Sequence, residues 1–322
     1  MTNHHRDWNI NTETERKFWT EPTPGTFIEL PKICPYCRKG AIGLKKTENI
    51  NAPFQGKCNY YKCTRNLNLR KDTIFGANAK TPVSVLYKII KYWLVDSLNA
   101  KNIEKKSLED YGVENVDMHV IYSLLFSCRQ LIATHLKNVY SLDRLSNEDD
   151  DEIICVDESL FTHNSHEQQW VVGLINISTN EIRLELVENR NEETLKKIIE
   201  KHVGYGNTIY TDSWSGYNFL DRQNSGYRHN VANHNEGIFG LTSRIEGIWG
   251  EIKAIIKILY VSIHSIHFVY FIKEAEYRRS IKNMSVKEKI NDFVTILSTI
   301  GPGNYLTEEN LLTLDYSVMY DD

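Results

Sequence analysis

The sequence has no run of about 18 apolar residues, the least that a membrane-spanning helix needs. Its first 19 residues are polar and lack the apolar stretch of a secretory signal. Cysteine is scarce, with 6 among 322 residues. We therefore expect an intracellular protein with no membrane partner, in the nucleus of a eukaryotic host and otherwise in the cytoplasm. In such a compartment the cysteines are metal ligands or buried thiols rather than disulfides.

The chain also lacks a strong net charge, which is only −4. The charge is nevertheless uneven along the sequence. Residues 1–106 hold 19 Lys and Arg against 9 Asp and Glu, whereas residues 107–322 hold 19 against 33. A basic first part favours contact with DNA. An acidic second part fits a site that concentrates divalent cations, and chance clustering of charges is the alternative.

Changes in composition divide the chain into five segments. Residues 1–30 form a polar lead-in. Residues 31–78 carry four of the cysteines, and residues 79–147 have helical periodicity. Five consecutive acids, Glu148–Glu152, mark a solvated boundary. An α/β domain over 148–285 and a tail over 286–322 follow.

Two cysteine pairs predict a zinc ribbon in the second segment. The first pair, Cys34-Pro-Tyr-Cys37, is a tight knuckle, and the second pair, about 20 residues later, has four intervening residues. A segment this short buries too little apolar surface to fold alone, so a bound metal supplies the missing free energy. The expected Zn²⁺ ligands are Cys34, Cys37, Cys58 and Cys63. The other two cysteines, Cys128 and Cys155, lie in apolar patterns typical of a core.

The third segment predicts a small helical domain. Thr81 and Pro82 suit an N-cap and a first helical residue, and apolar side chains recur at helical spacing up to Leu94. Residues 107–111, a turn at Gly112 and a helix over Val116–Leu136 then resemble a helix-turn-helix. Contact with DNA and ordinary packing of two helices both fit this pattern.

The fourth segment alternates strand and helix patterns. The expected strands are Ile153–Val156, Gln169–Ile177, Ile182–Val187, Thr208–Thr211 and Tyr227–Ala232. The expected helices are Glu192–His202, Trp214–Arg222 and Ser243–Tyr260. The order β-β-β-α-β-α-β-α predicts an α/β fold of the ribonuclease-H-like class, a mixed sheet flanked by helices.

Three carboxylates in this segment predict a metal site. Asp157 and Asp212 each follow an apolar strand pattern, and strand ends place side chains at the edge of a sheet. Glu246 borders the apolar stripe of the long helix and can face both aspartates. Glu158 is expected to point away from Asp157 because neighbouring residues of a strand alternate in direction. Glu251 is expected on another face of the helix.

Converging carboxylates repel one another unless a cation lies among them, and hard oxygen ligands select Mg²⁺ or Mn²⁺. Two such ions can serve phosphodiester chemistry. Lys253 and Lys257 lie on the same border of the helix as Glu246, where they can contact DNA phosphates. Each acid by itself also fits an ordinary surface carboxylate, so the prediction depends on the set.

Several stretches resemble Merlin-type DDE transposases and their bacterial insertion-sequence relatives. The resemblance runs from about Cys34 to about Ser280. It is carried by CPYC, RKDTIF, VDES, QWVVGLIN, IYTDSWSGY, NHNEGIF, SRIEGIWGEIK and EAEYRRS. Where such transposases commonly have His-Thr-Asn before Ile-Glu, this chain has Leu241-Thr242-Ser243. It also has no Lys or Arg in FTHNSHEQQ, where they tend to have a basic stretch.

The resemblance implies that Asp157, Asp212 and Glu246 are the catalytic metal ligands. Lys253 matches the basic residue seven positions after the glutamate, and His234 matches a histidine that precedes it. The implied activity is cleavage of double-stranded DNA at terminal inverted repeats and joining to target DNA, by a homodimer or larger assembly. A domesticated, non-catalytic DNA-binding protein and a nuclease that cuts without joining are the alternatives.

Overall fold

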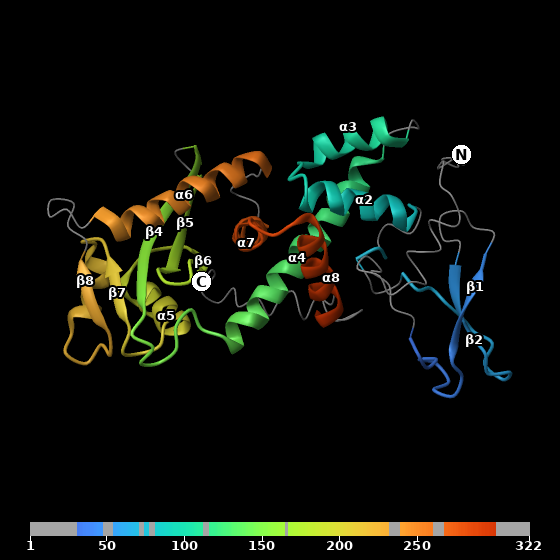
Figure 1. The fold of residues 1–322 in the computed structure, drawn as a ribbon, viewed down its shortest axis with the longest axis horizontal. Coiled ribbons are helices and arrows are strands. Elements are labelled where there is room, and N and C mark those ends of the chain that lie inside the picture. Colours follow the sequence, from blue (N-terminus) through green and yellow to red (C-terminus); the bar gives the residue numbers. More distant parts are fainter. Residues whose placement is uncertain are drawn as a thin grey trace. The chain divides into compact units, whose positions relative to one another are not determined.

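The computed structural model describes residues 31–47, 54–70, 74–76, 81–111, 116–164, 167–231, 239–259 and 267–300 (Figure 1). Within these ranges no helix is both long enough and apolar enough to cross a membrane. The described residues form two compact units, one from residues 31–131 and 283–300 and the other from residues 132–282.

The first unit begins with a small antiparallel sheet. Its strands β1 (Ile42–Lys46), β2 (Phe54–Cys58) and β3 (Asn66–Leu67) pair in that order. Arg70, which is 1% exposed, follows this sheet and donates hydrogen bonds to the carbonyls of Phe75 and Thr81. A buried guanidinium therefore ties the end of the cysteine-bearing segment to the start of the first helix.

Helices complete the first unit. They are α2 (Val83–Leu94), α3 (Ala100–Tyr111), the first part of α4 (Met118–Leu142) and α8 (Val286–Ile300). Trp93 of α2 is fully buried and packs edge-on against Phe293 of α8, with ring centroids 5.9 Å apart. Helix α8 lies in the segment that the sequence places in the tail. The N-cap of α2 is Pro82 rather than Thr81, because the helix starts one residue later than predicted.

The second unit is built on a five-stranded mixed sheet. Its strands are β4 (Ile153–Asn164), β5 (Glu167–Asn176), β6 (Ile182–Val187), β7 (Thr208–Thr211) and β8 (Arg228–Val231). Their order is β6-β5-β4-β7-β8, antiparallel from β6 to β4 and parallel from β4 to β8. The helical elements are α5 (Glu192–His202), the 3₁₀ helix η1 (Ser215–Asp221), α6 (Phe239–Leu259) and α7 (Phe268–Ser280).

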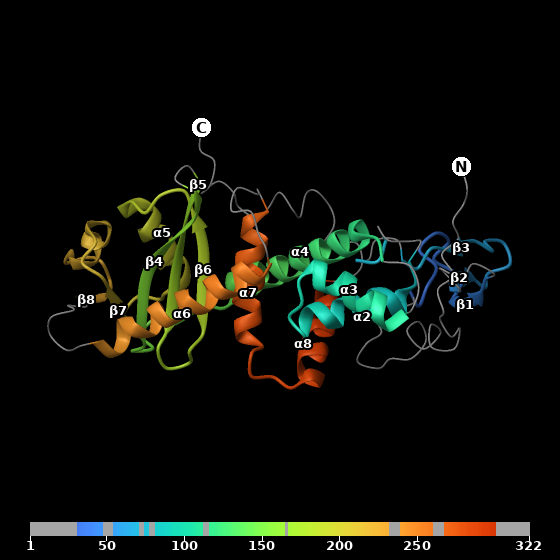
Figure 2. The same cartoon turned by 90° about the horizontal axis from the view of Figure 1, so that it is seen from above.

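Alternation along the strands gives the sheet two apolar faces. One face carries Cys155 and Val171 and packs against α6 and α7, whereas the other carries Ile154 and Val172 and packs against α5 and η1. Figure 2 shows α5 and α6 on opposite sides of the strands. The element order and the two covered faces are those of the ribonuclease-H-like fold, which confirms the predicted α/β class.

A buried polar cluster joins α7 to strand β6. Lys273 donates to the carbonyl of Leu184 (2.6 Å) and to Glu276 (3.0 Å), and Tyr140 also donates to Glu276. Burial lowers the pKa of Lys273 to about 8 and raises the pKa of Glu276 well above its usual range. These polar groups depend on one another, since all three side chains are buried.

We expect Lys273→Met to lower the free energy of unfolding by about 3–5 kcal/mol, because it removes the ammonium that lies 3.8 Å from the carboxylate of Glu185 and helps to lower its pKa. Lys282→Met is the matched control: Lys282 is 60% exposed and pairs with Glu251 at 2.9 Å. An exposed pair is worth less than about 1 kcal/mol. Urea unfolding measures both variants, and equal losses would contradict this role of Lys273.

Candidate active site and zinc ligands

The first aspartate lies within a strand rather than at its end. The sequence predicted a strand that stops at Asp157, but β4 continues to Asn164 because residues 157–164 form a hairpin with β5. Pairing with β7, however, reaches only from Ile153 to Cys155. Asp157 is therefore at an open edge of β4, beyond the last pair that β4 makes with β7. Asp212 directly follows β7, as predicted.

Glu158 joins these two aspartates, so the prediction that it points away is wrong. One carboxylate oxygen each from Asp157, Glu158 and Asp212 lies within 4.8 Å of the others. Asp157 and Glu158 start from opposite faces of the sheet. Among the described residues no strand pairs with them on the β7 side, so both side chains can turn around this edge toward Asp212. The side chain of Glu158 is only 2% exposed.

Among the described residues, the one cation paired with the three carboxylates is Arg190, whose Nη1 lies 4.0 Å from Oε2 of Glu158. Burial and the neighbouring acids raise the pKa of Asp157, although hydrogen bonds from Trp249 and the backbone oppose the shift. Burial, Asp212 and Asp157 raise the pKa of Glu158 to about 7. Oxygen Oε1 of Glu158 is buried and has no hydrogen-bond partner among the described residues. A divalent cation would offset the repulsion among these acids, so this donor set fits Mg²⁺ or Mn²⁺.

The third predicted acid, Glu246, lies on α6 and is exposed. It acts electrostatically on Asp157 and contributes to the rise of that pKa. Among the described residues, the close carboxylate group contains Glu158 rather than Glu246. Lys253 and Lys257 are also exposed on α6, and Lys253 Nζ lies 5.5 Å from the centre of the Phe161 ring. His234 lies outside the described residues.

Hydrogen bonds fix the backbone around Asp212. Its Oδ1 accepts from the backbone N–H of Trp214 at 2.9 Å, and its carbonyl accepts from the Thr211 hydroxyl at 2.8 Å. The same hydroxyl lies 2.9 Å from Nε2 of His229, whose Nδ1 lies 2.7 Å from Asp221. The loop that carries Asp212 is therefore held by hydrogen bonds through His229 of β8 and Asp221 of η1.

Trp249 orients the first aspartate, a role that the sequence did not reveal because Trp249 also belongs to the apolar stripe of α6. Its indole Nε1 donates to Asp157 Oδ2 at 2.9 Å, and the side chain is buried. The register of β4 and β5 places Gly173 directly opposite Asp157. A Cβ at Gly173 would lie 2.7 Å from two carbons of the Trp249 ring. The glycine thus leaves the space through which the indole reaches the carboxylate.

We expect Trp249→Phe and Gly173→Ala to weaken Mn²⁺ binding by about 10- to 100-fold, since residues that orient a metal ligand have effects of this size. The first change removes the N–H and keeps a ring, and the second displaces the ring. Titration calorimetry of the folded protein with Mn²⁺ measures the affinity. Gly247→Ala is the control, because a Cβ there meets nothing within 4 Å. Unchanged affinity in Trp249→Phe would overturn the role of the indole.

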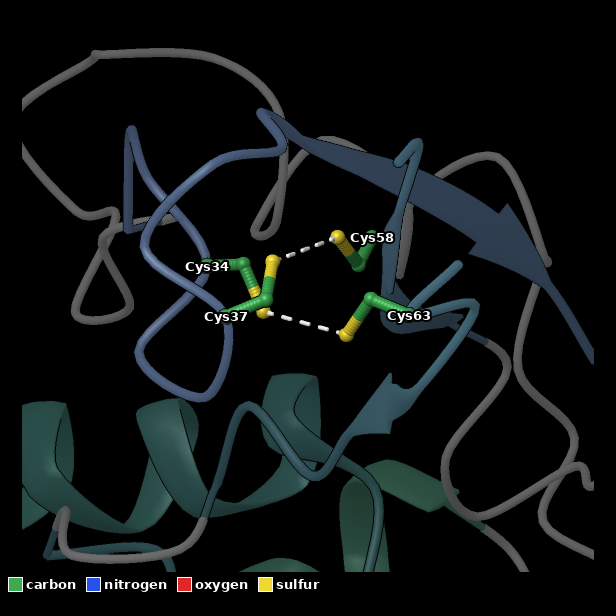
Figure 3. Close-up of side chains that lie close together, drawn as sticks. All are labelled: Cys34, Cys37, Cys58 and Cys63. Atoms are coloured by element: carbon green, nitrogen blue, oxygen red, sulfur yellow. Dashed lines mark hydrogen bonds between the residues drawn. The ribbon is translucent and has the colours of Figure 1, made fainter. Parts of the chain in front are cut away.

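The four predicted cysteine ligands do converge (Figure 3). Sγ of Cys34 lies 3.9 Å from Sγ of Cys63, and Sγ of Cys37 lies 3.6 Å from Sγ of Cys58. Tetrahedral zinc with bonds of 2.3 Å requires sulfur atoms about 3.8 Å apart, so the donors fit the metal. Backbone N–H groups, chiefly that of Lys39, lower the pKa of Cys37 to about 6, whereas burial raises the pKa of Cys58 to about 12. Cys128 and Cys155 are buried elsewhere, as predicted.

The fold and the acidic cluster define the class of the second unit, a ribonuclease-H-like domain with carboxylates gathered at one edge of the sheet. Residues 157–280 match the family described as the ISXO2-like transposase domain. This part of the chain is therefore similar to transposase domains of the DDE type. The match begins at Asp157 and ends at Ser280, and it confirms the resemblance that the sequence motifs indicate.

Other comparisons are more distant. No curated protein matches the chain. Among solved structures, the HTLV-2 integrase catalytic core domain in complex with magnesium (trimeric form) is 13% identical, with a TM-score of 0.24. The similarity covers 45% of this chain and 82% of that one.

Proposed function

We propose that the protein is a DNA transposase that cleaves double-stranded DNA at terminal inverted repeats and joins the freed ends to target DNA. The observation that carries the proposal is the convergence of Asp157 and Asp212 within an ISXO2-like transposase domain. Both aspartates are the residues that the transposase resemblance implies. A DNA-processing activity also accounts for a cluster of acids that is unfavourable without a cation.

In this proposal, Asp157, Asp212 and Glu246 hold Mg²⁺ or Mn²⁺, and Glu158 adds a fourth carboxylate at the same edge. When bound there, two such ions would supply the charge needed to activate an attacking oxygen and to stabilise the leaving 3′ oxygen of a phosphodiester. Trp249 keeps Asp157 in one orientation, and the hydrogen bonds of Thr211 and Trp214 keep Asp212 beside it. The chain thereby fixes its ligands before the metal and the DNA arrive.

The remaining predicted residues contact DNA. Lys253, Lys257 and His234 bind phosphates of the strand that enters the site. The zinc ribbon and the helical domain, with the basic balance of residues 1–106, bind the terminal repeats. Because two DNA ends must be brought together, a homodimer or larger assembly is the functional form. The DNA substrate locates this activity in the nucleus of a eukaryotic host, or else in the cytoplasm.

The test uses purified protein and a duplex that carries the inverted repeats flanking its gene. The proposal requires strand cleavage in Mg²⁺ or Mn²⁺, no cleavage with EDTA, and joined products when target DNA is added. Cleavage without joining would instead identify a nuclease of the same fold. Specific binding to the repeats with no cleavage in either metal would identify a domesticated DNA-binding protein.

A further inference from the structure

Arg190 lies between strand β6 and helix α5, held between two aromatic rings. The carbon of its guanidinium is 4.4 Å from the centre of the Trp170 ring and 3.9 Å from that of the Trp214 ring. The indole N–H of Trp214 donates to the Arg190 carbonyl at 3.1 Å. Stacking on the two faces and this hydrogen bond restrain both the side chain and its backbone, so little rotamer freedom remains to be lost on binding.

The N–H groups of this guanidinium are available to bind a ligand. Across the described residues, none of its N–H groups makes a hydrogen bond, although an arginine carries five such donors. Its nearest anion is Glu158, with 4.0 Å between Nη1 and Oε2, which is beyond hydrogen-bonding distance. The side chain remains 31% exposed. The donors therefore face the acidic cluster from a position that a ligand can reach.

We propose that Arg190 binds a phosphate of the DNA strand next to the scissile bond. The inference rests on the proposed function and adds a substrate contact to it. A DNA strand that approaches three carboxylates meets repulsion, which a cation fixed beside them offsets. The planar fork of a guanidinium matches two phosphate oxygens. Because Trp214 also donates its backbone N–H to Asp212, the same residue sets the positions of the phosphate contact and of a metal ligand.

Arg190 could instead serve only to compensate the charge of Glu158. The following variants distinguish that role from phosphate binding. Arg190→Gln removes the charge, and Arg190→Lys keeps it but loses the fork and the stacking. Combining Arg190→Gln with Glu158→Gln removes both partners of the ion pair. The matched control is Arg222→Gln, because Arg222 pairs with Glu192 in the same domain and its side chain is 57% exposed.

The experiment measures equilibrium binding of the full-length protein to a fluorescent duplex without divalent metal, over a range of KCl concentrations. Arg190→Gln should reduce the slope of log affinity against log salt by about 0.9 and weaken binding about eightfold at 0.1 M salt, the effect of one lost phosphate contact. Arg190→Lys should keep most of the slope with weaker binding. Arg222→Gln should match the wild type. Thermal unfolding verifies that each variant is folded.

Two results would overturn the inference: an unchanged slope in folded Arg190→Gln, or wild-type binding in the Arg190→Gln, Glu158→Gln pair. The second would mean that the arginine only compensates the acid. Failure of the proposed function is distinguishable. Wild-type protein that binds DNA through Arg190 but never cleaves it refutes the transposase activity alone, whereas cleavage that is indifferent to Arg190 refutes the phosphate contact alone.

Discussion

Asp157→Asn and Asp212→Asn are expected to abolish DNA cleavage, with losses of several orders of magnitude, while binding to the DNA ends stays nearly intact. Each change keeps the shape of the side chain and removes the negative charge that a divalent cation requires. Since the two carboxylates lie in one cluster, loss of either should disable the whole metal site rather than part of it. Single-turnover cleavage and end binding, measured on the same preparations, test the prediction.

The same assay shows which glutamate acts together with the two aspartates. Glu246→Gln should be as damaging as the aspartate changes, and Lys253→Ala should be milder because a phosphate contact does not activate the nucleophile. Glu158→Gln is also expected to reduce cleavage, because the Glu158 carboxylate lies in the cluster. Glu251→Gln is the control, since Glu251 pairs with Arg279 and Lys282. If Glu158→Gln abolishes DNA cleavage and Glu246→Gln does not, Glu158 rather than Glu246 is the third catalytic carboxylate.

Cys34→Ser is expected to reduce the zinc content from one ion per chain to almost none and to unfold the ribbon. Structural zinc contributes about 10–16 kcal/mol to the folding of small cysteine modules, far more than a sheet of this size provides. Elemental analysis gives the metal content, and hydrogen exchange at β2 reports the loss of pairing. The α/β domain should keep its protection, because no ligand of the cluster lies in it.

Cys128→Ser provides the control for zinc binding. Cys128 is buried in α4 and does not belong to the cysteine cluster, so this variant should retain one zinc per chain. Absence of zinc from freshly purified wild-type protein, or unchanged zinc in Cys34→Ser, would refute the ribbon. The expected effect on function is a loss of affinity for the DNA ends.

Most of the α/β domain was predictable because its elements carry strong periodic signals. Strand β6, helix α5 and strand β7 have the predicted bounds, and Asp212 follows β7 as expected. Strand β4 was predicted too short because residues 157–164 are polar and mixed, and only their pairing with β5 makes them a strand. Their mixed composition carries no alternating signal that would extend the strand past Val156.

The supporting residues of the site were not predictable for a similar reason. Alternation along a strand predicts that Glu158 faces away from Asp157, and only the short β7 creates the open edge where both turn toward Asp212. Trp249 carries the apolar signal of a core residue, and its donor role depends on the space left by Gly173 across the sheet. Arg190 appears in the sequence as one loop arginine, and its two tryptophan partners are distant along the chain.

The most direct test of the account is anomalous diffraction from crystals of the protein soaked in Mn²⁺. The account predicts a strong peak between the carboxylates of Asp157 and Asp212, with Glu246 or Glu158 as a further ligand, and no peak there in Asp157→Asn crystals. A well-ordered site with both aspartates in place and no manganese between them, at a concentration that supports cleavage, would contradict the central claim.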